Sequence, residues 1–226
     1  LNQRDPNLLP NYAVRLGFGA PTGLRELDEA AGLVPSPEWV RRNRGRTWGV
    51  PDAVNMAVGQ GDLFVTPMQM VRLVAAVANG GDLLVPQIVH HTGLIGEPPS
   101  WEFTPTVERN LGVRSDVITA VQEAMCRVTT DRTGTAEYVF GPTSSLGQTN
   151  LTVCGKTGTA QTGGERTPPH AWFVAYTPAE EPEIAIALIV ENSREGSEVA
   201  APIVRRILEA YYGEIDDVLP PRWWPP

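Results

Sequence analysis

The sequence predicts an α/β fold, in which a mainly helical region precedes an antiparallel sheet that a final helix covers. Residues 1–130 contain short apolar-periodic segments separated by Gly and Pro, a pattern typical of helices. Residues 151–160, 170–177 and 184–191 are rich in Val, Ile, Thr and aromatic residues, which favours strands. Because these three segments follow one another with short connections, we expect a consecutive meander.

The helical region has one segment with clear start and stop signals. Thr66 and Gln69 match a T-x-x-Q capping box, and Pro67 suits the first turn. Asn79-Gly80-Gly81 then ends the helix. We expect helices over residues 8–16, 24–31, 37–42, 52–58, 66–78 and 115–128, an extended segment over 83–91, and a last helix over about 198–212.

Composition and charge exclude several classes of protein. Apolar residues make up 42% and charged residues 19% of the chain, as in a folded globular protein. The net charge is −8 and no basic stripe occurs, which argues against nucleic-acid binding. No apolar run approaches the roughly 20 residues of a membrane helix. We therefore expect no targeting or anchoring segment within these residues.

Cys126 and Cys154 are the two cysteines. Neither belongs to a CxxC motif or a Cys/His cluster, so the sequence suggests no metal site. Their apolar neighbours favour two small core residues. The sequence allows a disulfide bond between them but gives no support for one.

Lys156 is the only lysine, since the other 17 basic residues are arginines. Lysine can lose its proton whereas arginine cannot, which makes this one position stand out. It opens the sequence Lys156-Thr157-Gly158-Thr159 within the first strand-like segment. K-T-G occurs beside S-x-x-K in the serine acyl-transfer sites of penicillin-binding proteins and β-lactamases.

The residue types of this motif suit acyl transfer. Lys156 supplies a positive charge, and Thr157 and Thr159 supply hydroxyl donors that can hold a substrate carboxylate. Alternation along a strand puts both threonines on one face and Lys156 on the other. At the edge of a sheet, such a strand can also pair with an extended peptide. Gly158 leaves room for a substrate, and the N–H of Thr159 would be an oxyanion donor.

A Thr/Gly-rich edge strand with one solvated lysine is the alternative interpretation. Arg132–Ala136 (RTGTA) echoes Lys156–Ala160 (KTGTA), which shows how readily the pattern arises. The echo follows a helix rather than lying in a strand, and its arginine is a poor substitute for lysine. We interpret Thr135 as the cap of a short helix.

Further segments, in order along the chain, resemble penicillin-binding protein transpeptidases. The resemblance covers about residues 7–213 and is closest to the class B, monofunctional D,D-transpeptidases of cell division or elongation. It rests on Gly17-Phe18-Gly19 with Thr22-Gly23 and Glu26, Ala57–Gly61 (AVGQG), Val65–Gln69 (VTPMQ), Ala78–Gly81 (ANGG), Gly155–Gln161 (GKTGTAQ), His170–Pro178 (HAWFVAYTP), Ile184–Glu191 and Ala200-Ala201-Pro202.

The resemblance implies the C-terminal part of the penicillin-binding-protein/β-lactamase-like transpeptidase fold, whose five-stranded sheet takes two strands from residues that precede this chain. It implies one partial domain over 1–213, with the mainly helical region at 1–130, strands and final helix at 151–213, and an irregular tail at 214–226. That tail includes two adjacent tryptophans that we expect to be held by packing.

The activity that the resemblance implies is cross-linking of peptidoglycan stem peptides through an acyl-enzyme that β-lactam antibiotics also form. It implies no metal or cofactor, and a place on the extracytoplasmic face of the cell membrane. Lys156 and Thr159 would be catalytic, and Thr157, Gly158 and Thr159 would bind substrate.

The chain departs from the family pattern because none of its seven serines begins S-x-x-K or S-x-N. In the family both motifs precede the region that this chain resembles. We interpret the chain as a fragment that is inactive alone and that either binds the missing N-terminal part of its domain or self-associates. A β-lactamase or D,D-carboxypeptidase of the same fold, or a non-catalytic binding or regulatory module, are the alternatives. Upstream S-x-x-K and S-x-N motifs would favour the enzyme. The serines are Ser36, Ser100, Ser115, Ser144, Ser145, Ser193 and Ser197.

Other polar residues receive more ordinary interpretations. His170 lies at a strand start, which favours a structural role over a place in a cleft. The arginines at 41, 42, 44 and 46 lie around Trp39 and Trp48 and are interpreted as a loop surface. Glu165 and Arg166 follow the motif strand and are candidates for bordering the substrate cleft.

Overall fold

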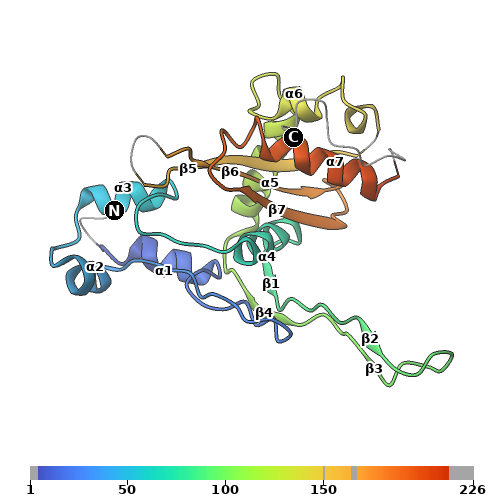
Figure 1. The fold of residues 1–226 in the computed structure, drawn as a ribbon, viewed down its shortest axis with the longest axis horizontal. Coiled ribbons are helices and arrows are strands. Elements are labelled where there is room, and N and C mark those ends of the chain that lie inside the picture. Colours follow the sequence, from blue (N-terminus) through green and yellow to red (C-terminus); the bar gives the residue numbers. More distant parts are fainter. Residues whose placement is uncertain (1–4, 150, 164–166, 214–226) are drawn as a thin grey trace. The chain divides into compact units, whose positions relative to one another are not determined.

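The computed structural model describes residues 5–149, 151–163 and 167–213. The chain divides into two compact units, residues 1–119 and 120–226, so the boundary falls within helix α5 (Figure 1). The predicted tail at 214–226 lies outside the described residues. The elements are α1 (Leu8–Arg15), α2 (Pro37–Arg44), α3 (Val50–Ala57), α4 (Pro67–Ala78), β1 (Asp82–Leu84), β2 (His91–Thr92), β3 (Trp101–Glu102), β4 (Val107–Asn110), α5 (Ser115–Thr130), α6 (Glu137–Phe140), the 3₁₀ turn η1 (Leu146–Gln148), β5 (Cys154–Ala160), β6 (His170–Thr177), β7 (Ile184–Val190) and α7 (Ala200–Tyr211).

Helix α4 begins as its sequence predicts. The N–H of Gln69 donates to Thr66 Oγ1 (3.1 Å), and the N–H of Thr66 donates to Gln69 Oε1 (3.0 Å), which completes the capping box. The buried Gln69 side chain also donates to the carbonyls of Ala20 (2.8 Å) and Ala31 (2.9 Å). This one side chain therefore both caps a helix and fixes the loop that precedes α2.

The predicted helix over 24–31 is wrong, because this segment forms turns and irregular structure. The Glu29 carboxylate accepts hydrogen bonds from the Thr22 hydroxyl (2.5 Å) and from the N–H groups of Gly23 (2.9 Å) and Leu24 (3.0 Å). Such bonds from a side chain to nearby backbone compete with helix formation.

The first unit has its main core among helices α1 to α3 and their loops, with Ala13, Phe18, Val40, Trp48, Ala53 and Met56 buried.

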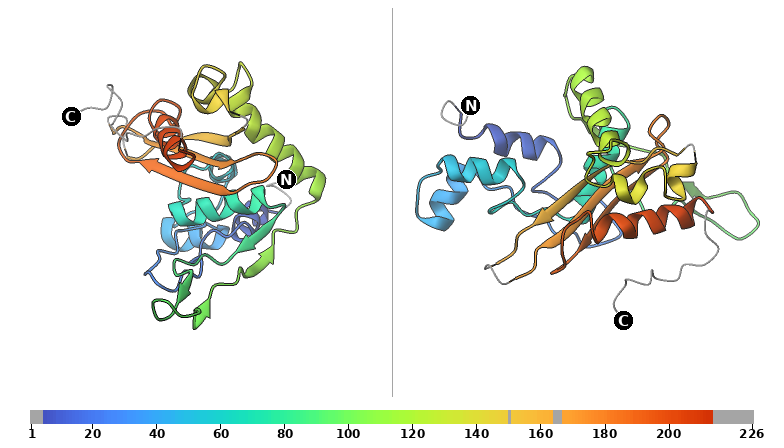
Figure 2. Two further views of the ribbon diagram at one scale, coloured as in Figure 1. Left: turned by 90° about the vertical axis from the view of Figure 1, so that its right-hand side faces the viewer. Right: turned by 90° about the horizontal axis from the view of Figure 1, so that it is seen from above.

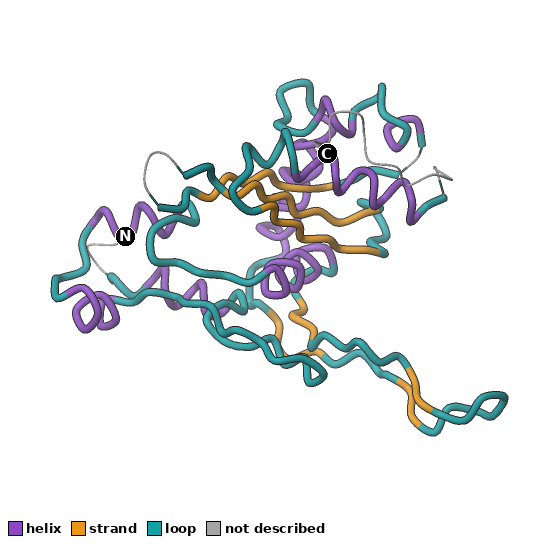
Figure 3. Tube along the Cα trace, in the orientation of Figure 1, coloured by secondary structure: helices purple, strands orange, loops and turns teal. Residues whose placement is uncertain are grey.

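The predicted extended segment over 83–91 is split between two small antiparallel sheets. Strand β1 pairs with β4, and β2 pairs with β3 in a narrow hairpin that continues from them (Figure 3). Arg72 of α4 is nearly buried and donates to the carbonyl of Leu84 (2.5 Å) while pairing with Glu108 of β4. These bonds hold strands β1 and β4 against α4.

The predicted antiparallel meander is confirmed in the second unit, where the sheet has the order β5-β6-β7. Helix α7 lies along one face of this sheet (Figure 2). The core between them buries Phe173 from β6 against Val204 and Leu208 from α7. Among the described residues, β5 has β6 as its only strand partner, so the motif strand lies at an edge as predicted.

Strand β7 forms the other edge of this sheet. Its side chains at 184, 186, 188 and 190 pack against the α7 core, whereas Ala185, Ala187 and Ile189 alternate onto the opposite face. All seven residues are half-buried. Both faces of β7 are thus apolar, and its outer backbone has no strand partner within the described part of the chain.

The two cysteines are joined by a disulfide bond, which the sequence allowed but did not support, and Cys154 is a buried core residue as expected. Cys126 lies in α5 and Cys154 is the first residue of β5.

In the described ranges, no helix has both the length and the apolar character that crossing a bilayer requires.

Candidate active site

Strand β5 places the four residues of the motif at the sheet edge. Lys156 and Thr159 are exposed, and Thr157 and Gly158 are half-buried. The register sets Lys156 opposite Val174 and Thr157 opposite Phe173, so the threonines share the face that α7 covers and Lys156 lies on the other. Lys156 Nζ donates to the carbonyl oxygen of Thr157 (2.5 Å), which holds the ammonium group close to the strand.

Position 155 has to be glycine, because the ring of Phe173 leaves no room there for a side chain. A Cβ at Gly155 would lie 2.6 Å from Phe173 Cζ and 2.8 Å from the carbonyl oxygen of Val174. The Phe173 ring is itself stacked on Phe140 of α6, with 5.4 Å between centroids and 16° between planes. Because both rings are buried, the motif strand is seated on a rigid layer directly before Lys156.

The loop between β7 and α7 lies directly against the backbone of Gly158. A Cβ at the buried Gly196 would be 2.1 Å from the carbonyl oxygen of Trp172 and 2.4 Å from that of Gly158. The N–H of Ala201 donates to the Gly196 carbonyl (2.9 Å), which ties this loop to α7. The sequence analysis did not identify Gly196, because a lone glycine in a loop does not indicate a contact with a strand that lies much earlier in the sequence.

Thr135, from the RTGTA echo, contacts the motif strand directly. Its Oγ1 lies 2.8 Å from Oγ1 of Thr157. The interpretation of Thr135 as a helix cap is wrong, because the N-cap of α6 is Ala136 and that cap has no side-chain hydrogen bond. The echo was the signal that could have drawn attention to Thr135, although not to this contact.

His170 begins β6 and accepts, through Nδ1, a hydrogen bond from the N–H of Asn192 (3.0 Å). This contact agrees with the structural role predicted for it. Glu165 and Arg166, the candidates for bordering the cleft, lie outside the described residues.

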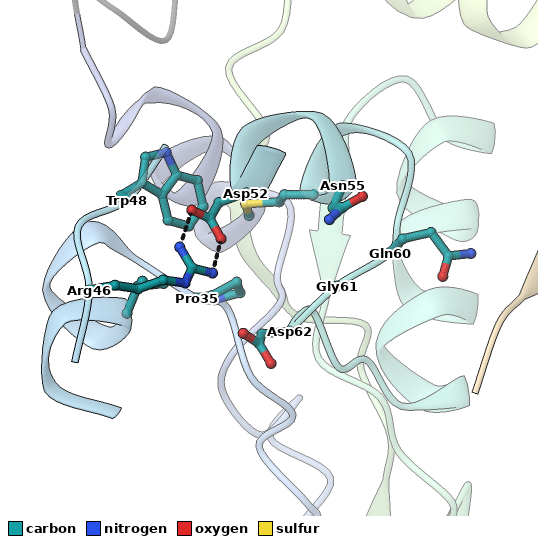
Figure 4. Close-up of a pocket in the computed structure, with 10 residues that line it drawn as sticks. Pro35, Arg46, Trp48, Asp52, Asn55, Gln60, Gly61 and Asp62 are labelled. Carbon is teal, nitrogen blue, oxygen red and sulfur yellow. Dashed lines mark hydrogen bonds and ion pairs between the residues drawn. The ribbon is translucent and has the colours of Figure 1, made fainter. Parts of the chain in front are cut away.

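A cavity of about 280 Å³ lies within the first unit (Figure 4). Arg46 donates to both carboxylate oxygens of Asp52 (2.7 and 2.6 Å), and this bond lowers the pKa of Asp52. Arg44 pairs with Asp62, and Arg42 pairs with Glu38 at 2.5 Å. Arg41, Arg42 and Arg44 lie on helix α2 and only Arg46 lies in a loop, so the predicted loop surface is mostly a helical one. The carboxylate partners of Arg42, Arg44 and Arg46 argue against an open anion site. The cavity is lined by Pro35, Val40, Arg46, Trp48, Asp52, Asn55, Met56, Gln60, Gly61 and Asp62.

Comparison with protein families matches residues 4–209 to the penicillin binding protein transpeptidase domain. Among curated proteins, the chain is 32% identical over 212 residues to the peptidoglycan D,D-transpeptidase MrdA of Acinetobacter baumannii, covering 88% of this chain and 30% of that protein. MrdA of Haemophilus influenzae is 28% identical over 221 residues, covering 91% of this chain and 33% of that protein.

Solved structures give the same result. PBP2 of Pseudomonas aeruginosa, in complex with WCK 5153, has a TM-score of 0.73 and 30% identity, covering 96% of this chain and 45% of that one. Penicillin-binding protein A of M. tuberculosis, as a penicillin G acyl-enzyme complex, has a TM-score of 0.69 and 27% identity, covering 90% and 42%. The α/β transpeptidase fold expected from the sequence is thereby confirmed.

The chain spans about a third of the length of the curated relatives that it matches, 33% and 30% for the two MrdA proteins. Family match, relatives and fold agree over nearly all of its residues. The chain therefore belongs to the penicillin-binding protein transpeptidase family, and resembles its class B D,D-transpeptidases throughout.

Proposed function

We propose that this chain supplies the substrate-binding edge strand of a peptidoglycan D,D-transpeptidase, whose serine nucleophile belongs to residues that the sequence does not include. The observation that carries the proposal is the edge position of Lys156-Thr157-Gly158-Thr159 on β5, where Lys156 and Thr159 are exposed. The absence of S-x-x-K and S-x-N among its seven serines supports a site that is completed by other residues.

In this proposal an extended stem peptide pairs with the free edge of β5, as added strands do on other sheets. The hydroxyls of Thr157 and Thr159, on one face of β5, bind the peptide's carboxylate, and the Lys156 ammonium group on the other face supplies positive charge at the same edge. The N–H of Thr159 donates to the oxyanion that forms when the serine attacks the carbonyl, while Gly158 adds no side chain to the strand beside it. The roles of these four residues are thus positioning and charge stabilisation.

β-Lactam antibiotics are proposed to acylate the same serine. The solved relative from M. tuberculosis carries penicillin G as an acyl-enzyme, which supports this chemistry for the intact protein. By family resemblance the protein would act at the extracytoplasmic face of the cell membrane, in cell division or elongation. The N-terminal part of the same domain, or a second copy of this chain, would be its partner.

Lys156→Ala in the intact protein tests the site. We expect acylation by a fluorescent penicillin to fall by about 100-fold, because a charged partner of the carboxylate or oxyanion is lost. Arg132→Ala in the echo is the matched control and should be acylated at nearly the normal rate. Equal behaviour of the two variants would refute the assignment to Lys156.

The 226-residue chain by itself gives a second test. It should form no covalent adduct with the fluorescent penicillin, whereas the intact protein should. Labelling of any of its seven serines would contradict a nucleophile outside this sequence. Rapid hydrolysis of the adduct by the intact protein would favour a β-lactamase over a transpeptidase.

A further inference from the structure

Two hydroxyl groups that lie far apart in sequence meet at the proposed carboxylate site. Thr135 Oγ1 is 2.8 Å from Thr157 Oγ1, on the face of β5 that also carries Thr159. Each hydroxyl has one proton to donate and two lone pairs to accept with. Only one of the two protons can lie between the oxygens, so the other proton is available to a further acceptor.

The turn that carries Thr135 is held firmly by backbone bonds. The N–H of Gly134 donates to the carbonyl of Asp131 (2.7 Å), and the N–H of Ala136 donates to that of Val128 (3.0 Å). A Cβ at Gly134 would lie 2.5 Å from two carbonyl oxygens at the end of α5, so the chain passes tightly across that helix end. Thr135 is thereby presented to β5 from a fixed backbone.

A second set of bonds braces the same turn. The Asp131 carboxylate accepts from the N–H (2.9 Å) and the hydroxyl (2.7 Å) of Thr133, and these bonds lower the pKa of Asp131. The turn therefore keeps its shape at neutral pH, where this carboxylate is charged. Thr135 itself is exposed.

We propose that Thr135 is a positioning residue for Thr157, an inference that rests on the proposed carboxylate-binding role of β5. A carboxylate can only accept, so a bound ligand draws the proton of Thr157 toward itself. Thr157 then has a lone pair to accept the proton of Thr135. The relay runs from Thr135 to Thr157 to the carboxylate, and each bond polarises the next.

The relay predicts that the Thr135 hydroxyl raises the acylation rate for ligands with a free carboxylate and leaves the rate unchanged for ligands without one. A merely structural role would affect both kinds equally. Penicillin G and its methyl ester separate these cases, because esterification removes the anionic acceptor while leaving the reacting ring. Thr135→Val keeps the shape and removes the donor, and Thr135→Ser restores the donor.

In the intact protein, we expect Thr135→Val to lower the second-order acylation rate for penicillin G by roughly three- to tenfold. The rate for the methyl ester should stay within about twofold of the parent's, and Thr135→Ser should recover the penicillin G rate. Thr130→Val is the control, because Thr130 is also exposed and its hydroxyl donates to the carbonyl of Cys126 (3.0 Å) instead. It should leave both rates unchanged.

A double-mutant cycle completes the test. In a Thr157→Val background, the added Thr135→Val change should have no further effect, since the relay is already broken. Equal loss for acid and ester, or additive losses in the cycle, would overturn the role of Thr135 while leaving the proposed function intact. Failure of penicillin to acylate the intact parent protein would overturn both.

Discussion

Cys126 and Cys154 are covalently joined, and this bond fastens helix α5 to the first residue of β5, directly before the Gly155-Lys156 pair. Cys126 Sγ also lies 4.0 Å from the hydroxyl of Tyr176 on the neighbouring strand. The start of the motif strand is thus held to α5 by a bond as well as by packing.

Breaking this bond should destabilise the second unit. The two cysteines are separated by 28 positions, and closing a loop of that length raises the free energy of the unfolded chain by about 3.5 kcal/mol. We expect Cys126→Ala to lower the free energy of unfolding by about this amount, measured by urea denaturation without reductant. Dithiothreitol should bring the parent chain to the variant's level and leave the variant unchanged. A parent midpoint that reductant does not move would contradict the prediction.

Replacing Gly196 should disturb the motif strand. The Cβ of Gly196→Ala would approach two backbone oxygens to within 2.4 Å, so the loop or β5 must shift. We expect a loss of about 1 to 3 kcal/mol in unfolding free energy and slower acylation of the intact protein by penicillin. Gly45→Ala is the control, because Gly45 has φ +65° but nothing within 4 Å of the added Cβ. It should cost roughly 1 kcal/mol through backbone strain while acylation stays normal.

The Arg46–Asp52 pair should contribute stability that depends on pH. The hydrogen bond from Arg46 lowers the pKa of Asp52 below its ordinary 3.8, and Asp52 also accepts from the N–H of Gly49 (2.8 Å) at the start of α3. Since the folded-state pKa lies below the unfolded one, this stability is present above about pH 4 and is lost as the pH falls through the folded value. Asp52→Asn should therefore lower the unfolding free energy by about 1 kcal/mol at pH 7 and have progressively less effect in acid.

Asp116→Asn is the matched control for this pH dependence. Arg114 and Asp116 form the same kind of pair, yet their side chains are 79% and 62% exposed. Solvent screens such pairs, so thermal denaturation at pH 7 should show no measurable change. A pH-independent effect of Asp52→Asn would show that the carboxylate charge is not what stabilises α3.

The free edge of β7 should make the isolated chain associate. Unpaired strand edges with apolar faces recruit other strands, and burying more of a half-buried apolar face contributes about 25 cal/mol per Å². Sedimentation of the 226-residue chain should show concentration-dependent oligomers, with slow amide exchange over 184–190. Ile189→Lys places a charge on the face opposite the α7 core and should shift the chain toward monomer. A compact wild-type monomer with fast-exchanging β7 amides would refute the association.

The sequence predicts those elements whose signals are local. Strands β6 and β7 fall where Val, Ile and aromatic residues cluster, and α4 begins at its capping box. The helix expected over 24–31 failed because Glu29 bonds to the Thr22 hydroxyl and nearby N–H groups, and apolar periodicity does not report such bonds.

The contacts around the motif could not be predicted, because they join residues distant in sequence. Thr135 and Thr157 are 22 positions apart, and the disulfide joins residues 28 apart. Each depends on how α5 and the turn after it pack on the sheet. The motif alone could identify Lys156 as the candidate cation. Only the folded chain shows that the hydroxyl of Thr135 contacts that of Thr157.

The exposed Lys156 has a practical consequence, because it is the only side-chain amine in the sequence. A protease specific for lysine has a single target bond in this chain, between Lys156 and Thr157, in the middle of β5. A paired strand resists cleavage until it opens locally. The cutting rate therefore reports on the opening of the motif strand alone, and an amine-reactive dye placed at Lys156 would report on its occupancy.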